Sequence, residues 1–146
     1  MNRCKMENTM NNYSPLSLAF LGDAVYGLLV REHLLKTANQ RPGKLHTLST
    51  ACVNAQAQAQ ASRAIFPLLT EEELAVFKRG RNAHPNHTPK NQSEGDYHYA
   101  TGLESLFGYL YLKGENDRLR ALFDAIWQNG VEKAESDTKN DRENGD

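Results

Sequence analysis

Hydrophobic side chains recur at helical spacing in five segments of the chain, and they show no sustained alternation with polar residues of the kind that strands require. Clusters of polar residues, proline and glycine separate the segments, as is typical of loops. We expect helices over residues 15–36, 44–64, 70–80, 96–113 and 116–131. The predicted fold class is therefore all-α.

Capping signals mark two of these helix starts. Ser14 followed by Pro15 is an N-cap before a proline at the first helical position. Thr70 and Glu73 have the spacing of a capping box, in which each side chain bonds the backbone N–H of the other residue. Residues 81–95 read as a long polar loop, and loops of that length in compact domains are commonly functional.

Two of the expected helices have unusual compositions. The first is apolar on most faces, which indicates a central buried helix. The helix over 44–64 is rich in alanine and glutamine. Its small side chains favour close packing against another helix, and its glutamines suggest one face in contact with solvent.

The net charge of −1 is unevenly distributed along the chain. Residues 132–146 carry six acids and three bases, so about +2 remains on residues 1–131. A mildly basic domain permits a nucleic-acid partner without requiring one. We expect a flexible N-terminal arm over 1–13, one catalytic domain over 14–131 and a disordered acidic tail over 132–146.

Cysteine usage and hydropathy favour a cytoplasmic protein. The two cysteines form no disulfide framework, and the chain opens on no signal-peptide pattern. No apolar run reaches the ~18–20 residues that span a bilayer, so we expect no membrane association. The sequence also contains no serine or cysteine triad pattern and no Walker phosphate loop, and it predicts no small-molecule cofactor.

Each of the two most apolar helices carries a carboxylate within its apolar stretch, Asp23 in one and Glu104 in the other. Small residues stand four positions before and after each: Ala19 and Gly27 around Asp23, and Ala100 and Gly108 around Glu104. Small side chains let helix backbones approach closely. We therefore expect the two helices to cross there, with Asp23 facing Glu104.

Two carboxylates held together repel each other unless they share a proton or bind a cation, and oxygen ligands of this kind suit Mg²⁺. The alternative is that each acid is partly exposed or paired with a nearby Lys or Arg. From the residue pattern alone, the two interpretations are evenly matched.

A basic stretch follows the third helix. No acid occurs between Glu73 and Glu94, and positive charge is supplied by Lys78, Arg79, Arg81 and Lys90. Clustered bases beside a glycine are suited to bind phosphates. The alternative is a solvated helix end, where basic residues complement the helix dipole.

Four segments occur in the order LAFLGDAVY, FKRGRNA, TPKN and LESLFGYLYL. Together, over about residues 14–130, they resemble the mini-ribonuclease III group, small bacterial relatives of ribonuclease III. The resemblance implies a ribonuclease III-type helical endonuclease domain, a homodimer, and Mg²⁺-dependent cleavage of double-stranded RNA to 5′-phosphate and 3′-hydroxyl ends. It also implies maturation of the 23S (large-subunit) ribosomal RNA precursor.

The resemblance also implies roles for individual residues. FLGD resembles the ribonuclease III signature helix, which makes Asp23 the catalytic, metal-binding aspartate. LESLFGYLYL makes Glu104 the second catalytic and metal-binding carboxylate. The chain ends too early for a separate double-stranded-RNA-binding domain, so we expect RNA contacts from Arg79 and Arg81, and more weakly from Lys78 and Lys90.

The sequence departs from full-length ribonuclease III at three positions. Leu16, Ala19 and Thr101 stand where that enzyme has further acids, and the mini group shares these losses. They leave open whether a second metal ion binds. Two other functions remain as alternatives: a non-catalytic double-stranded-RNA-binding ribosome assembly factor, and an all-α Mg²⁺-dependent nucleoside triphosphate pyrophosphohydrolase, which should gather several acids at helical spacing.

Overall fold

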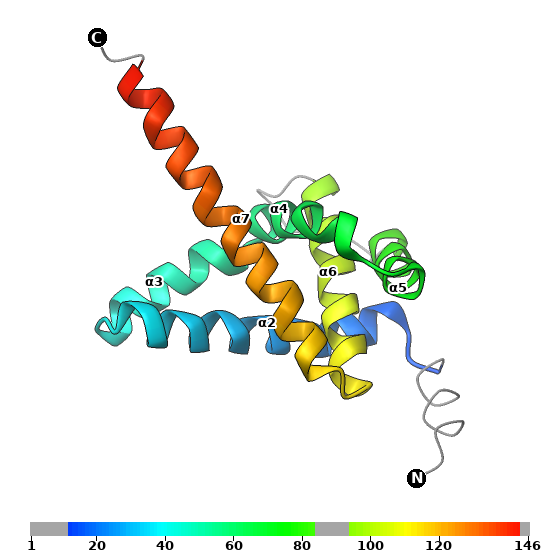
Figure 1. Ribbon diagram of the computed structural model, residues 1–146. Coiled ribbons are helices and arrows are strands. Elements are labelled where there is room, and N and C mark those ends of the chain that lie inside the picture. Colours follow the sequence, from blue (N-terminus) through cyan, green and yellow to red (C-terminus); the bar gives the residue numbers. More distant parts are fainter. Residues whose placement is uncertain (1–11, 84–93, 144–146) are drawn as a thin grey trace.

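The computed structural model describes residues 12–83 and 94–143, and this part of the chain consists of helices joined by short connections, with no strand, which confirms the all-α prediction (Figure 1). The elements in order are α2 (Pro15–Ala38), α3 (Pro42–Val53), α4 (Ala55–Ile65), the 3₁₀ helix η1 (Phe66–Leu68), α5 (Glu71–Asn82), α6 (Glu94–Leu112) and α7 (Asn116–Glu143). No helix in these two ranges is long and apolar enough to cross a membrane.

Helix α6 is the centre of the fold, since α2, α5 and α4 all pack against it (Figure 1). Its residues Leu103, Leu106 and Phe107 are completely buried. Tyr26 of α2 packs edge-on against Phe107, with ring centroids 5.3 Å apart, and against Phe123 of α7 at 5.9 Å. These contacts join α2, α6 and α7 into one apolar core.

Two glycines set the crossing of α2 and α6. A Cβ atom on Gly22 would overlap the carbonyl oxygen of Glu104, and one on Gly108 would overlap the carbonyl oxygen of Leu18. The two backbones therefore touch at these glycines, where the side chain of any other residue would not fit. The predicted crossing is confirmed, but Gly27 takes no part in it, because a Cβ there would meet only the Arg31 side chain of its own helix.

The helix expected over 44–64 is interrupted, so that prediction is wrong. Asn54 adopts an extended conformation (φ −69°, ψ 161°) between α3 and α4. Its side-chain oxygen accepts a hydrogen bond from the backbone N–H of Ala57 at 2.8 Å. Asparagine is among the best N-cap residues, and here it begins a new helix in the middle of a helix-forming run.

Other boundaries also differ from the expected ones. The capping box at Thr70 and Glu73 is confirmed, but α5 continues to Asn82 and α6 begins at Glu94, which shortens the expected loop at both ends. Most of that loop, and residues 1–11 of the expected arm, lie outside the described residues. We expected disorder from residue 132, whereas α7 continues to Glu143 and projects away from the other helices (Figure 1). Residues 132–143 contain neither proline nor glycine, so nothing in them stops the helix.

Candidate active site

A cleft of about 370 Å³ lies where α2, α4 and α6 meet, and both Asp23 and Glu104 line it. Asp23 directly follows the crossing glycine Gly22 and is exposed at the cleft wall. Glu104 is half-buried and contributes its own carbonyl to the same crossing. The close backbone contact thus brings the two carboxylates to one place, as the sequence predicted.

The electrostatics of the cleft disfavour two free carboxylates. The pKa of Glu104 is raised to about 8, first by burial and second by the negative charge of Asp23, while the amide of Gln58 opposes this shift. Within the described part of the chain, no Lys, Arg or His forms an ion pair with either acid. The alternative in which each acid is balanced by a nearby base therefore finds no support there.

This donor set fits a hard divalent cation. A cation between Asp23 and Glu104 would remove their repulsion and favour ionisation of Glu104. No group of three or more His, Cys, Asp or Glu side chains with metal-binding geometry occurs in the described residues. Two carboxylates suit Mg²⁺ in particular, because that ion keeps several waters and takes its remaining ligands from phosphate oxygens.

The three positions that lack the further acids of ribonuclease III belong to the same cleft, since Leu16, Ala19 and Thr101 all line it. The Thr101 hydroxyl donates to the carbonyl of Tyr97 at 2.9 Å, a bond within its own helix. The missing acids therefore leave a less negative cleft, with two carboxylates from the chain.

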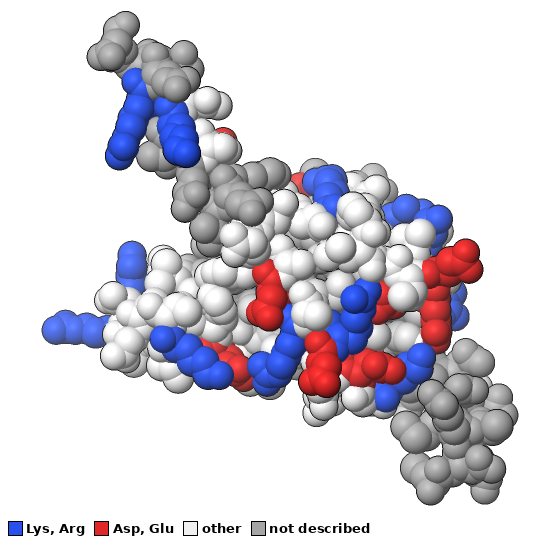
Figure 2. All heavy atoms as spheres, in the orientation of Figure 1, with Lys and Arg blue, Asp and Glu red and all other residues white. Residues whose placement is uncertain are grey.

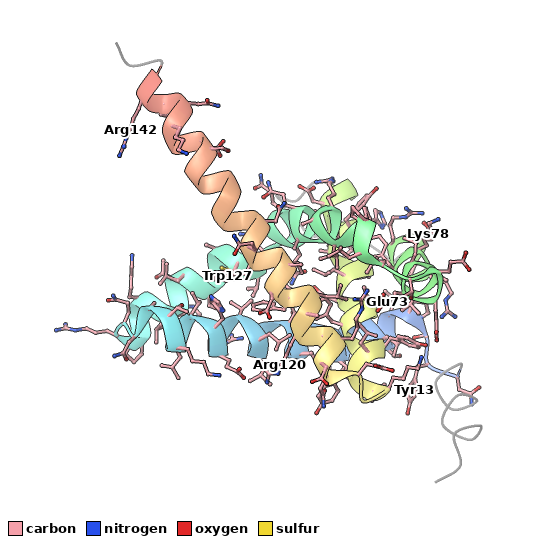
Figure 3. All side chains as sticks on the ribbon, in the orientation of Figure 1. Tyr13, Glu73, Lys78, Arg120, Trp127 and Arg142 are labelled. Carbon is pink, nitrogen blue, oxygen red and sulfur yellow. The ribbon has the colours of Figure 1, made fainter. Side chains whose placement is uncertain are left out.

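The basic residues lie on the neighbouring helix. Gly80 of α5 packs so closely on α6 that a Cβ there would overlap the Ser105 side chain, one residue after Glu104. Lys78 and Arg79 precede this contact and are exposed, and Figure 3 shows Lys78 at the outer edge of α5. Arg81 is partly exposed, and its Nε donates to Asn82 Oδ1 at 3.1 Å. Lys90 lies outside the described residues.

The basic residues of α5 differ in their ion pairing from basic residues elsewhere on the molecule. On the face in Figure 2, acidic and basic side chains alternate over α2 and the start of α7. There Glu32 pairs with Lys36 at 3.1 Å and with Arg120 at 3.0 Å. Among the described residues, no carboxylate pairs with Lys78, Arg79 or Arg81, which leaves these charges available to an anionic partner.

Two features of the site were missed from the sequence. Gln58 is 1% exposed and lines the cleft, although we expected the glutamines of this segment to face solvent. Gln56 and Gln60 are exposed as expected. Two residues correspond to about 200° around a helix, so the spacing itself places Gln58 on the opposite face.

The second feature is an uncovered apolar surface on α2. Phe20, three residues before Asp23, lines the cleft and is 85% exposed, and Leu28 and Leu35 are also exposed. The helix expected to be buried on most faces is therefore buried on one side. Its apolar composition indicated more packing surface than one domain needs.

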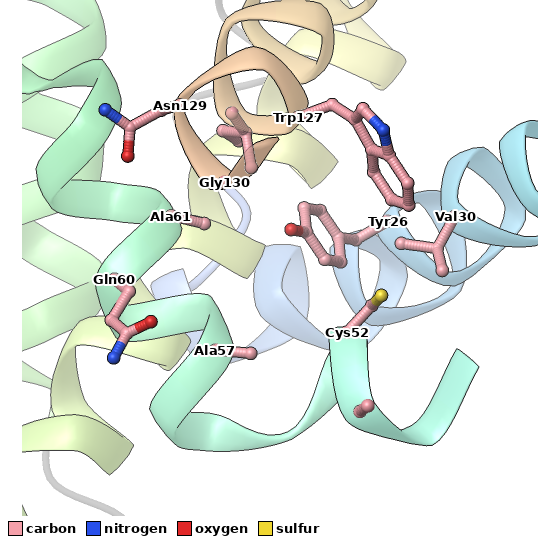
Figure 4. A pocket seen from close by; sticks show the side chains of 11 residues that line it. Tyr26, Val30, Cys52, Ala57, Gln60, Ala61, Trp127, Asn129 and Gly130 are labelled. Carbon is pink, nitrogen blue, oxygen red and sulfur yellow. The ribbon is translucent and has the colours of Figure 1, made fainter. Parts of the chain in front are cut away.

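Another hollow, of about 360 Å³, lies between α2, α4 and α7 (Figure 4). Tyr26, Cys52 and Trp127 line it, together with the amides of Gln60 and Asn129 and with small or apolar residues. Burial raises the pKa of both Tyr26 and Cys52, which keeps them neutral. No charged side chain lines this hollow, whereas two carboxylates line the cleft of Asp23 and Glu104, which makes that cleft the candidate active site.

Comparison with known proteins shows the family of this chain. The Ribonuclease III domain family matches residues 16–115. Mini-ribonuclease 3 of a Thermoanaerobacter species is 47% identical over 111 residues, covering 76% of this chain and 78% of that protein. Mini-ribonuclease 3 of Brevibacillus brevis is 44% identical over 119 residues, covering 82% and 89%.

The fold has a solved counterpart in protein FN1578 from Fusobacterium nucleatum, with a TM-score of 0.73 and 29% identity over 82% of this chain and 95% of that one. The matching family model and the all-α fold are those of a ribonuclease III-type endoribonuclease. The chain belongs to the ribonuclease III family, among the proteins named Mini-ribonuclease 3.

Proposed function

We propose that this endoribonuclease is Mg²⁺-dependent, cleaves double-stranded RNA as a homodimer and acts on the large-subunit ribosomal RNA precursor. The observation that carries the proposal is the pair Asp23 and Glu104, which share one cleft without a positive partner among the described residues. Such a pair is stable as two carboxylates when a cation lies between them.

In the proposed reaction, water attacks the phosphorus of a phosphodiester bond and the bond to the 3′ oxygen breaks, which leaves a 5′-phosphate and a 3′-hydroxyl. Asp23 and Glu104 would hold the Mg²⁺. When bound, this ion lowers the pKa of a water molecule and neutralises charge on the non-bridging oxygens. Arg79 and Arg81, with Lys78 and Lys90 as weaker contributors, would contact backbone phosphates.

Double-stranded RNA suits these groups because a protein reads it by shape and backbone contacts. The bases of A-form RNA lie in a deep, narrow groove that side chains do not enter. The guanidinium groups of Arg79 and Arg81 form no ion pair with a described carboxylate and are suited to such phosphates. The ribosomal RNA precursor is proposed from the sequence resemblance to mini-ribonuclease III.

The homodimer is supported by the exposed apolar side of α2. An exposed Phe20 beside the cleft, with Leu28 and Leu35 further along the helix, would gain free energy by burial against a second copy. We expect light scattering at micromolar concentration to give twice the chain mass of 16.4 kDa. Phe20→Ala should shift this equilibrium towards the monomer, and a monomeric wild-type protein would contradict the dimer.

The function is tested with a long RNA duplex and, as a matched control, one of its strands alone. We expect cleavage of the duplex with Mg²⁺, no cleavage with a chelator, and an intact single strand under both conditions. Binding without cleavage would favour the assembly-factor alternative, and hydrolysis of nucleoside triphosphates would favour the pyrophosphohydrolase. Faster cleavage of a ribosomal precursor stem than of an unrelated duplex would support the proposed substrate.

A further inference from the structure

Gln58 is a buried polar side chain whose donor is unused. It is 1% exposed, and its Nε2 has no hydrogen-bond partner among the described residues. A buried amide donor that lacks a partner destabilises a fold, so folded proteins seldom retain one without a use for it. Gln58 lines the same cleft as Asp23 and Glu104.

The backbone holds Gln58 firmly in this position. Its N–H donates to the carbonyl of Asn54 at 3.0 Å, which is the first hydrogen bond of α4. The Asn54 side chain caps the same turn through the N–H of Ala57. The break between α3 and α4 thus fixes the turn that carries Gln58, and α4 packs on α6, the helix of Glu104.

The Glu104 carboxylate is an acceptor that lines the same cleft as this donor. The Gln58 amide lies close enough to lower the pKa of Glu104, against the larger opposite effects of burial and of Asp23. Even so, Nε2 makes no hydrogen bond of ordinary geometry to a described residue. A carboxylate is a strong acceptor for an amide donor, and an adjustment of side-chain torsions would bring Nε2 to an oxygen of Glu104.

We infer that Gln58 is a positioning residue, whose Nε2–H donates to one oxygen of Glu104 and leaves the other directed towards a cation shared with Asp23. The inference rests on the proposed cation site. Partners of this kind fix the rotamer of a metal-binding carboxylate, and their loss typically weakens metal affinity about 10- to 100-fold.

The test compares Gln58→Met with Gln56→Met. Methionine has the length and flexibility of glutamine without its donor, and Gln56 is an exposed glutamine on the same helix. The first readout is calorimetric binding of Mn²⁺ to the RNA-free protein. We expect Gln58→Met to raise the dissociation constant about tenfold and Gln56→Met to leave it unchanged, with the helical content of both preserved.

Cleavage gives the second readout. Gln58→Met should require more Mg²⁺ for half-maximal cleavage and recover most of the wild-type rate at saturating Mg²⁺, because both carboxylates remain. A dissociation constant equal to that of the wild type would overturn the inference and leave Gln58 as a packing residue. A wild-type protein that binds no Mn²⁺ would overturn the proposed function itself, and the positioning role with it.

A third readout needs no variant. In the wild-type protein, the side-chain amide signals of Gln58 in a ¹H–¹⁵N spectrum should shift on addition of Mg²⁺, and their hydrogen exchange should slow. The side-chain signals of Gln56 should stay in place. Unchanged Gln58 signals at saturating Mg²⁺ would overturn the inference even if Gln58→Met failed to fold.

Discussion

Glu73 and Glu104 are two carboxylates withdrawn from solvent in opposite electrostatic settings. Glu73 of α5 is 5% exposed, and Arg118 of α7 donates to both of its oxygens, at 2.9 and 2.8 Å. These bonds are the main reason why the pKa of Glu73 is lowered. Glu104 faces a second carboxylate instead, and burial is the main reason why its pKa is raised to about 8.

The contrast separates a carboxylate that stabilises the fold from one that has no positive partner among the described residues. Arg118 also donates to the carbonyl of Leu68 at 2.6 Å, so the Glu73 cluster joins η1, α5 and α7 and stabilises the fold. Nothing comparable compensates Glu104 within the described residues. A protein retains such an unfavourable group where function needs it, which is why strongly perturbed carboxylates in clefts indicate active sites.

The largest expected effect is on cleavage. Asp23→Asn and Glu104→Gln should each lower the cleavage rate by roughly 10³-fold, because either change removes a ligand of the charge-neutralising cation. Initial rates on duplex RNA at fixed Mg²⁺ measure this, with circular dichroism to confirm folding. Near-wild-type activity in either variant would show that the two carboxylates do not share the catalytic ion.

The next effect is on stability, at the other glutamate. Arg118→Met should lower the free energy of unfolding by about 3 kcal/mol, because it leaves the buried Glu73 carboxylate without its cation. Lys36→Met is the matched control, since it breaks an exposed ion pair with Glu32 and should change stability little. Urea denaturation measures both. Equal effects of the two variants would remove the distinction between the Glu73 cluster and the surface pairs.

A pH dependence of opposite sign distinguishes the two glutamates. The pKa of Glu104 is about 8 in the folded chain, against an ordinary 4.5. Between these pH values the carboxyl is ionised in the unfolded chain and protonated in the folded chain. Without a bound cation, the free energy of unfolding therefore falls as pH rises from about 4.5 to about 8. Glu104→Gln removes the ionisable group, so its free energy of unfolding does not fall in this way. It should therefore be more stable than the wild type at pH 8.5, by roughly 2 kcal/mol after discounting for incomplete burial, and nearly equal at pH 4.

Glu73→Gln should show the reverse. Because the pKa of Glu73 is lowered, its ionised form stabilises the fold above the unfolded pKa, and that contribution disappears as pH falls through the folded value. The variant should be less stable than the wild type at neutral pH, and the difference should shrink in acid. Denaturation in chelator-containing buffer measures both variants. A destabilised Glu104→Gln protein at pH 8.5 would contradict the assignment of Glu104.

The smallest expected effect is on RNA affinity. In an Asp23→Asn background, which allows binding without cleavage, Arg79→Ala with Arg81→Ala should weaken duplex binding. Each lost phosphate contact should flatten the plot of log affinity against log salt by roughly 0.7–0.9. Arg142→Ala, at the far end of α7 in Figure 3, is the control. An unchanged slope in the double variant would show that these arginines do not contact RNA phosphates and belong only to a solvated helix end.

Local sequence signals predicted much of this architecture. The capping box of Thr70 and Glu73 appears as the spacing indicated, because both of its hydrogen bonds lie within four residues. The crossing of α2 and α6 was also predictable, since small residues beside an apolar face permit close approach. The rotation of α2 about its own axis determines which glycine makes the contact. Tertiary packing sets that rotation, and it places Gly22 rather than Gly27 against α6.

Features set by distant contacts were not predictable. The Ala/Gln-rich segment has uniform helix propensity, and the extended conformation of Asn54 divides it so that α4 packs against α6. The burial of Gln58 follows from that division. Arg118 lies 45 residues from Glu73 in the sequence, so no local spacing connects them. Sequence periodicity predicts which face of a helix is apolar. It does not predict which other element packs against that face.

The glycine contact between α2 and α6 has a mechanical consequence. If α2 rotated relative to α6 about this contact, each atom would move in proportion to its distance from the contact. Gly22 meets the backbone of Glu104 at this pivot, and Asp23 is the next residue, so both carboxylates lie on short lever arms. Helix α2 has 24 residues and α6 has 19, so a small rotation about this contact would displace their ends more than it changes the gap between the two acids. The contact therefore keeps the spacing of the two acids nearly constant under small rotations of the helices.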